Sequence, residues 1–391
     1  MTTTPNTSTE SPGTDPGAVP AVKRRGGIRG REGMAGWIFV TPVVVILGLF
    51  LLLPIIVAIW VSISDWGGKG SPLGANFVGA DNYEALLTKP GLSQQNLATS
   101  LRNNLYYVIL VVPIQTVLAL VLASILNGRR LKGKGFFRTA FYFPSVTSSV
   151  AIVTVFLFMF TGTGVVNHIL GWFGIHGPNW FNDPRGVLRL ILGGLHIINP
   201  DSPPGWLVNN HFLGMSWYDW LSGPSVAMCA LIILAVWTTG GTFMLMFLAA
   251  LQDVPDDVLE AARVDGATRW QTFRSVTLPA LRPTLFLVIT LGLIGTWQVF
   301  DQIYLTGGGG PAKTTLTPAF LSYQAAFGDY KWGQGAAISF ILFAIIIVLT
   351  IIQRLVMRER KKLPRRRRFG TVPPVGSGSE TVAAATAGGS R

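Results

Sequence analysis

The stretch WIFVTPVVVILGLFLLLPIIVAIWVSI, residues 37–63, contains 27 residues and no charged side chain. A helix needs about 20 predominantly apolar residues to cross a bilayer core of roughly 30 Å. The stretch is also longer than the apolar region of a cleaved signal peptide. It therefore predicts a helix that spans a membrane and is retained in the mature protein.

Five further uncharged stretches follow, at about 105–126, 139–160, 225–251, 284–300 and 336–352. The last two are short, but uncharged flanking residues extend them. Because backbone groups in lipid must pair within their own segment, helices are the expected form. The sequence thus predicts an all-α membrane protein with six transmembrane helices. Helix breakers within the stretches are expected to kink or loosen them: Pro54, Pro113, Pro144 and the pair Gly240–Gly241.

The composition agrees with this class. Only 13% of residues are charged and 49% are apolar, whereas a soluble surface of this size needs about twice that charged fraction. The net charge of +13 does not indicate nucleic-acid binding, because the basic residues flank apolar stretches and no basic face with interleaved aromatic residues appears. One cysteine, Cys229, and four histidines without metal-ligand spacing predict no metal site.

The positions of the basic residues predict the orientation. With six spans, the two tails and the second and fourth loops share one side, and that side holds 24 of the 31 Lys and Arg residues. The short loop near 127–138 contains five basic residues and no acidic one. By the positive-inside rule both termini are cytoplasmic. Residues 1–36 and 359–391 are expected to be disordered cytoplasmic tails around a transmembrane domain at 37–358, the second tail contacting anionic lipid headgroups.

Several chemistries are missing from the sequence. No G-x-x-x-x-G-K-[ST] phosphate loop occurs, so this chain is not expected to hydrolyse ATP. No charged residue lies inside the six stretches, and ion-coupled carriers usually place ionisable groups there. An ion-coupled secondary transporter is disfavoured but stays open, since neutral oxygens can bind sodium. A membrane scaffold without a transport role also stays open.

The loop at 253–283 reads DVPDDVLEAARVDGATRWQTFRSVTLPALRP. Its acidic start, with Asp253 as a capping carboxylate and Pro255 close behind, predicts the beginning of a helix. Apolar residues recur at spacings of three and four, which predicts one helical face: Leu259, Ala262, Gly266, Trp270 and Phe273. Glycine costs a helix about 1 kcal/mol relative to alanine. Gly266 therefore predicts a turn between two short helices or a close backbone contact. From the residues alone, a loop that only packs on its own span ends is an equal alternative.

The same loop resembles the EAA motif of the permeases of binding-protein-dependent ABC importers with a MetI-like transmembrane domain. The match consists of Glu260–Ala261–Ala262, Gly266 and Val276–Thr277–Leu278–Pro279, and Asp265, Ala267, Gln271 and Phe273 fit the sugar-permease version. Residues 77–83, 136–144 and 300–311 are similar to the carbohydrate branch. In contrast, the second outer loop is longer than usual there, at about 178–212.

The resemblance implies a type I importer fold in a prokaryotic cytoplasmic membrane. The loop would form a helix–turn–helix that docks into a groove of a separate ATPase, through Glu260, Ala261, Ala262, Asp265, Gly266, Leu278 and Pro279. The implied partners are a second homologous permease, an ATP-binding cassette ATPase dimer that uses ATP and Mg²⁺, and an external sugar-binding protein. This chain itself would be non-catalytic and bind no cofactor.

Sugars are typically held by aromatic stacking and hydrogen bonds. Residues of these types near the fourth and fifth spans are candidates for the substrate path: Trp237, Trp297, Gln298, Asp301, Gln302 and Tyr304. Aromatic residues also gather at membrane interfaces without any substrate role, and this alternative stays open.

Overall fold

The computed structural model describes residues 31–128, 131–194 and 205–357. Several features predicted above lie outside these residues. They are most of the two tails with their basic clusters, Arg129 and Arg130 of the short basic loop, and residues 195–204 of the long outer loop.

The described chain is mostly helical, and five of its helices are long and apolar enough to cross a membrane. The first, Gly36–Ser62, begins within α1 (Arg31–Leu47) and continues through the π-helical η1 (Gly48–Leu52) and α2 (Leu53–Ser62). The others are α4 (Leu92–Asn127), α11 (Val226–Gln252), α15 (Arg282–Trp297) with α16 (Asp301–Leu305), and α18 (Trp332–Val356). A helical membrane protein with five to six candidate spans is thereby confirmed. The exact number of six and the cytoplasmic termini stay predictions.

The third predicted span, residues 139–160, is not one straight helix. It consists of α5 (Lys134–Val146) and α6 (Ser149–Met159), which meet at 99°. Thr147 and Ser148 between them have extended ψ values of 149° and 132°. Pro144 lies inside α5, three residues before Thr147. Because a proline disturbs the helical turn that precedes it and α5 continues through that turn, Pro144 does not account for the break. The predicted loosening of this span is confirmed as a complete break, which lies after Val146.

The prediction for Gly240–Gly241 is wrong, because α11 continues unbroken through both residues. A Cβ added at Gly241 would overlap the backbone carbonyl of Phe141 on α5. A Cβ at Gly240 would meet only Leu118 Cδ2, at an ordinary 3.6 Å. Gly241 is therefore required for the close approach of α5 to α11.

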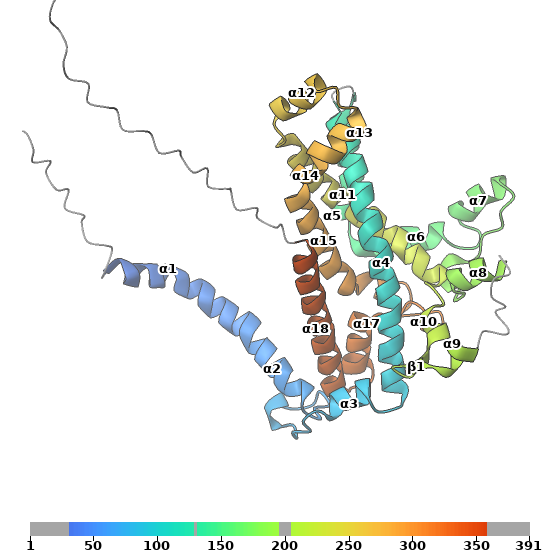
Figure 1. Ribbon diagram of the computed structural model, residues 1–391. Coiled ribbons are helices and arrows are strands. Elements are labelled where there is room, and N and C mark those ends of the chain that lie inside the picture. Colours follow the sequence, from blue (N-terminus) through green and yellow to red (C-terminus); the bar gives the residue numbers. More distant parts are fainter. Residues whose placement is uncertain (1–30, 129–130, 195–204, 358–391) are drawn as a thin grey trace, which may run out of the picture.

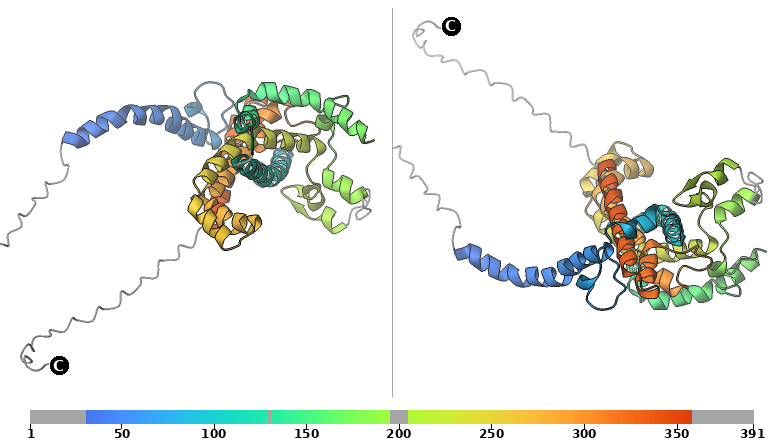
Figure 2. Two further views of the ribbon diagram at one scale, coloured as in Figure 1. Left: turned by 90° about the horizontal axis from the view of Figure 1, so that it is seen from above. Right: turned by 90° about the horizontal axis from the view of Figure 1, so that it is seen from below.

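The first span extends away from the other helices in Figures 1 and 2. None of the residues in its most apolar window is buried within the chain. It packs on the remaining helices through α2, whose partner is α18. The start of helix α3 (Asp81–Leu87) also holds the end of this span. Asn82 donates to the carbonyl oxygens of Ser62 and Ser64 at 3.0 and 2.9 Å, and Tyr83 donates to Ser62 Oγ at 2.9 Å.

Short elements connect the spans. The segment after α2 contains η2 (Pro72–Gly74) and α3 (Asp81–Leu87). The long segment after α6 contains α7 (Val165–Trp172), η3 (Trp180–Asn182), α8 (Val187–Gly194), α9 (Gly205–Asn209), the antiparallel pair β1 (His211–Phe212) and β2 (Met215–Ser216), and α10 (Trp217–Trp220). The segment after α16 contains α17 (Pro318–Tyr323) and η5 (Gln324–Gly328). Between α11 and α15 lie α12 (Asp256–Val264), α13 (Arg269–Thr272), the π-helical η4 (Phe273–Thr277) and α14 (Leu278–Ala280).

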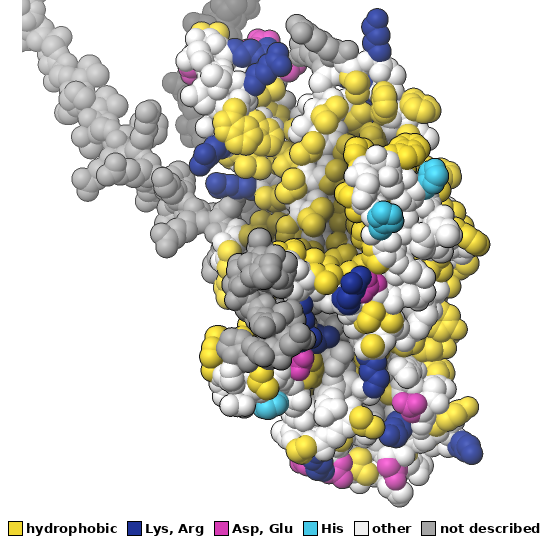
Figure 3. Space-filling view, turned by 90° about the vertical axis from the view of Figure 1, so that its right-hand side faces the viewer, with side chains coloured by type: hydrophobic (Ala, Val, Ile, Leu, Met, Phe, Trp, Pro, Cys, Tyr) yellow, Lys and Arg dark blue, Asp and Glu magenta, His cyan; other side chains and the backbone are white. Residues whose placement is uncertain are grey.

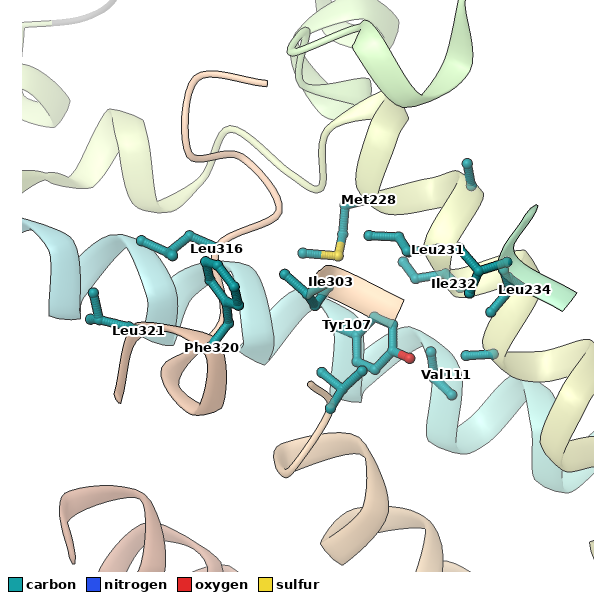
Figure 4. Packing of buried hydrophobic residues seen from close by; sticks show 14 of the residues in the cluster. Tyr107, Val111, Met228, Leu231, Ile232, Leu234, Ile303, Leu316, Phe320 and Leu321 are labelled. Carbon is teal, nitrogen blue, oxygen red and sulfur yellow. The ribbon is translucent and has the colours of Figure 1, made fainter. Parts of the chain in front are cut away.

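The main core lies where α4, α11 and the segment 299–325 converge (Figure 4). Tyr107 and Val111 of α4 meet Met228 and Leu231 of α11 there, and Ile303 of α16 packs between the two helices. A second cluster joins α4, α11 and α15 near the other end of the bundle. In Figure 3 the apolar side chains form a band across one face, while charged side chains gather above and below it. This distribution suits a bilayer.

Replacing Gly241 with alanine is expected to destabilise the protein, whereas the same change at Gly240 is not. Overpacking of a close contact costs typically 1–3 kcal/mol, but alanine in an open helical position gains up to about 1 kcal/mol. Thermal unfolding of the two purified variants in detergent measures the difference. Equal midpoints for Gly241→Ala and Gly240→Ala would refute the close contact between α5 and α11.

Candidate functional site

The segment predicted to couple with an ATPase forms a helix–turn–helix, here called the coupling hairpin (residues 256–280). It consists of α12, a turn at 265–268, and α13 continued by η4 and α14. Figure 1 shows it at one end of the bundle, beyond the start of α15. The turn predicted at Gly266 is confirmed, since Gly266 has φ +75° and a Cβ there would meet nothing within 4 Å. Within the described part of the chain no backbone approaches Gly266 closely, so the alternative of a close backbone contact stays a prediction for a partner chain only.

Hydrogen bonds explain the spacing between Ala262 and Gly266. The Ala267 N–H donates to the Ala262 carbonyl at 3.0 Å, and the Gly266 N–H donates to the Arg263 carbonyl at 3.0 Å. This pair of bonds is the Schellman motif, which places a left-handed residue, usually glycine, four positions after the first of these carbonyls. The next helix starts at once, because Thr268 and Gln271 form a reciprocal capping box.

Two details of the prediction are wrong. Asp253 does not cap α12, because Pro255 is the N-cap residue and no side chain caps the helix; Asp253 instead ends α11. The apolar residues spaced by three and four also do not share one face. The chain reverses at Gly266, so that Leu259 and Ala262 are half-buried while Trp270 is 67% exposed.

The predicted coupling residues divide into two groups. Glu260, Ala261, Asp265 and Gly266 are exposed at the tip of the hairpin. Ala262 of α12 is half-buried, and so are Leu278 and Pro279 of α14 at the base of the hairpin. Val264 is 87% exposed near the tip, and Arg263 and Arg269 are exposed there as well. The tip therefore presents acidic, basic and apolar side chains to the solvent.

The base of the hairpin is anchored in the second core cluster. Leu281 is completely buried there, among Phe247 and Leu248 of α11 and Val288 of α15. The Leu285 N–H donates to the Leu281 carbonyl at 2.8 Å, which continues the helical pattern into α15. By contrast, a hollow of about 560 Å³ lies beside α12 and α13. The hairpin is thus joined to the bundle mainly through α15.

The other end of α15 lines a cavity of about 270 Å³, here called the polar cavity. Its walls come from α4, α11 and α15, together with Ser149 and residues 298–302. The polar residues in these walls are Tyr107, Gln115, Ser149, Thr239, Thr296, Gln298, Asp301 and Gln302.

Gln115 is the central polar group of this cavity. It is only 1% exposed, and its Oε1 accepts a hydrogen bond from Thr239 Oγ1 at 2.6 Å. Its Nε2 has no hydrogen-bond partner in the described part of the chain. A buried amide donor without a partner is costly, so an acceptor brought by a ligand would stabilise this group once the Gln115 side chain turns toward the cavity. A Cβ at Gly292 would lie 2.5 Å from Nε2, and this glycine therefore leaves room for the amide.

Three of the predicted path residues line the polar cavity, and three do not. Gln298, Asp301 and Gln302 lie in its wall, and Gln302 Oε1 accepts from the Tyr107 hydroxyl at 3.0 Å. Trp297 is only 4% exposed and packs in a separate core cluster. Trp237 contacts Phe156, and Tyr304 stacks on Phe300. Gln115 and Thr239 were missed, although neutral polar side chains within uncharged stretches were a visible signal.

Comparison with known proteins decides the family. Residues 115–362, more than half of the chain, match the family model described as the binding-protein-dependent transport system inner membrane component. The chain belongs to this family. The resemblance stated from the EAA motif is confirmed, and this permease is an integral membrane protein of a transport system that depends on a binding protein.

Individual relatives cover nearly the whole permease. The lactose transport system permease protein LacF of Rhizobium radiobacter is 31% identical over 87% of this chain and 100% of its own length. The trehalose/maltose transport system permease protein MalF of Thermococcus litoralis is 30% identical over 85% of this chain and 96% of its own. A crystal structure of a bacterial ABC transporter involved in the import of alginate has the same fold, with a TM-score of 0.62 at 18% identity over 85% of this chain and 98% of that chain.

Replacing Gly266 with valine is expected to impair coupling more than replacing it with asparagine. A β-branched residue in the left-handed region costs roughly 1–2 kcal/mol, whereas asparagine visits that region more readily. No atom of the described chain lies within 4 Å of a Cβ at Gly266, so clashes within this chain do not contribute. ATP-driven uptake in proteoliposomes would measure the effect. If both variants transport like the wild type, the turn is not required.

Replacing Gln115 with leucine is expected to reduce uptake about tenfold or more without loss of folded protein. A hydrogen bond between Gln115 and the ligand is worth roughly 0.5–1.5 kcal/mol. A ligand group left unpaired by the substitution adds a further cost. Thr239→Val removes only the hydroxyl that donates to Gln115 Oε1, so it should reduce uptake less than Gln115→Leu does. Uptake and thermal stability are measured on the same preparations. Unchanged uptake in Gln115→Leu would remove Gln115 from the path.

Proposed function

We propose that this chain is a sugar-conducting permease subunit of an ATP-driven importer in a prokaryotic cytoplasmic membrane. It would pair with a second homologous permease, and an external binding protein would deliver the sugar. The single observation that carries this proposal is the course of α15. This helix starts at the base of the coupling hairpin and ends in the wall of the polar cavity.

The exposed tip of the hairpin supports docking of an ATPase. Glu260, Ala261, Asp265 and Gly266 are accessible there, while Ala262, Leu278 and Pro279 are half-buried. We assign to these seven residues the coupling role that the EAA motif implies. ATP and Mg²⁺ would be bound by the ATPase dimer and not by this chain. Docking requires the hairpin to be cytoplasmic, which agrees with six spans and cytoplasmic termini.

The chemistry of the polar cavity supports a sugar as the cargo. Hydroxyl groups both donate and accept hydrogen bonds, and the wall offers both functions. The unpaired Gln115 Nε2 can donate, and Asp301 can accept. Two of the relatives above are described as permeases for lactose and for trehalose/maltose. Gln298 and Gln302 remain path candidates on the same grounds. Trp237 and Tyr304 are 47% and 50% exposed and remain candidates outside this cavity, whereas Trp297 is buried.

The mechanism that follows is alternating access. Closure of the ATPase dimer on ATP would move the docked hairpin, and the continuous helix would pass this displacement to the cavity wall. A helix of 16 residues is about 24 Å long and moves as a unit, which suits rigid-body rocking of packed helices. The secondary-transporter and scaffold alternatives provide no role for an exposed, precisely turned hairpin on this helix.

Purification of the tagged chain from its native membrane is expected to bring down an ATPase and a second permease. Glu260→Lys should lose the ATPase and keep the second permease, because a reversed charge at the exposed tip opposes docking while the spans are unchanged. Mass spectrometry of the purified complexes measures this. Uptake by the wild-type complex should require ATP inside the vesicle; uptake that follows an ion gradient without ATP would contradict the proposal.

A further inference from the structure

The polar cavity contains one charged side chain. Of the sixteen residues in its wall only Asp301 is ionisable at neutral pH, and no Lys, Arg or His of the described chain takes part. The remaining polar groups are neutral amides and hydroxyls. This chain therefore contributes a wall with net negative charge to the path.

The Asp301 carboxylate is not neutralised within the described part of the chain. It is exposed, and neither an ion pair nor a hydrogen bond to its oxygens occurs there. Asp301 begins the short helix α16, directly after the non-helical residues 298–300 that follow α15. Apolar side chains of the same cavity, such as Val111 and Phe243, surround the polar wall. Apolar walls focus the field of a charge into a cleft, so a passing solute experiences this carboxylate more strongly than it would on an open surface.

We propose that Asp301 makes the path selective for uncharged saccharides over anionic ones. This inference rests on the translocation path proposed above and adds the charge class of its cargo. A neutral sugar can donate hydroxyl hydrogen bonds to the carboxylate, whereas a sugar acid brings a like charge into the same cleft, and like charges are disfavoured there. The structural neighbour described as an importer of acidic alginate shares the fold, and its cargo class does not carry over.

Charged thiol reagents can measure the sign and size of this field directly. Cys229 is the only cysteine of the chain, and Cys229→Ala removes it. Gly295 lines the cavity, and a Cβ there would meet no atom within 4 Å, so Gly295→Cys places a reporter thiol without a clash. The assembled complex in proteoliposomes is treated from outside with a cationic or an anionic methanethiosulfonate of similar size. Modification is scored on this chain alone by mass.

With Asp301 present, the cationic reagent is expected to react at least roughly fivefold faster than the anionic one, after correction for their rates with a free thiol. Asp301→Asn should abolish most of this preference, and Asp301→Lys should reverse it. The matched control is Asp329→Asn, which removes an exposed outer carboxylate that does not line the cavity and should leave the preference unchanged.

The outcomes separate this inference from the proposed function. If Gly295→Cys reacts with both reagents and the preference is independent of Asp301, charge selection by Asp301 is refuted while an accessible path remains. If the reporter thiol reacts with neither reagent at any stage of the ATP cycle, the cavity is not part of the path, and both proposals fail. A preference that follows Asp301 and not Asp329 supports the inference.

Discussion

The bilayer imposes the constraint on which this structure depends, because hydrocarbon offers no hydrogen-bond partners to the chain. Helices satisfy the backbone, and polar side chains within the spans must find partners nearby. Thr116 and Thr296 bond to carbonyl oxygens one turn earlier in their own helices, and Gln353 of α18 donates to Phe286 of α15. Some buried polar atoms within the spans still lack a partner in the described part of the chain, among them Gln353 Oε1, Trp297 Nε1 and Gln115 Nε2, and of these three residues only Gln115 lines the polar cavity. A polar group that the fold leaves unsatisfied beside a cavity is the kind of group that a passing ligand can satisfy.

In the proposed function, coupling and conduction would share one helix, α15. The coupling hairpin is held through the buried Leu281 and the start of α15, and the last two turns of α15 supply Gly292, Gly295 and Thr296 to the cavity. Packed helices in a dense core shift as units because their contacts do not deform continuously. A displacement at the hairpin therefore reaches the cavity without any chain of side-chain switches, and the two regions need no direct contact.

Glycine and proline show how similar sequence signals acquire different meanings. Gly266 was predicted to form a turn from its cost in a helix, and its φ of +75° and Schellman hydrogen bonds give the physical reason. Gly241 was predicted to loosen its helix, yet it admits the backbone of α5 against an unbroken α11. Pro144 precedes a break of 99°, whereas Pro113 lies within a continuous helix of 36 residues. The residue type is the same in each pair, but the Gly266 turn is made by local hydrogen bonds, whereas the role of Gly241 depends on the neighbouring helix α5.

The sequence by itself determined the class of protein, most span positions, the turn at Gly266 and the membership of the permease family, because apolar length, glycine conformation and motif spacing are properties of the local chain. It also singled out Gln298, Asp301 and Gln302. Only the tertiary structure showed that these three residues line one cavity together with Gln115 and Thr239 from two other helices. It also showed that Trp297 is packed in a core cluster instead. The reason is that a cavity wall is built from residues that are far apart in sequence. The side of an apolar helix that faces the cavity depends on how the helices pack, and the sequence of one span does not determine that packing.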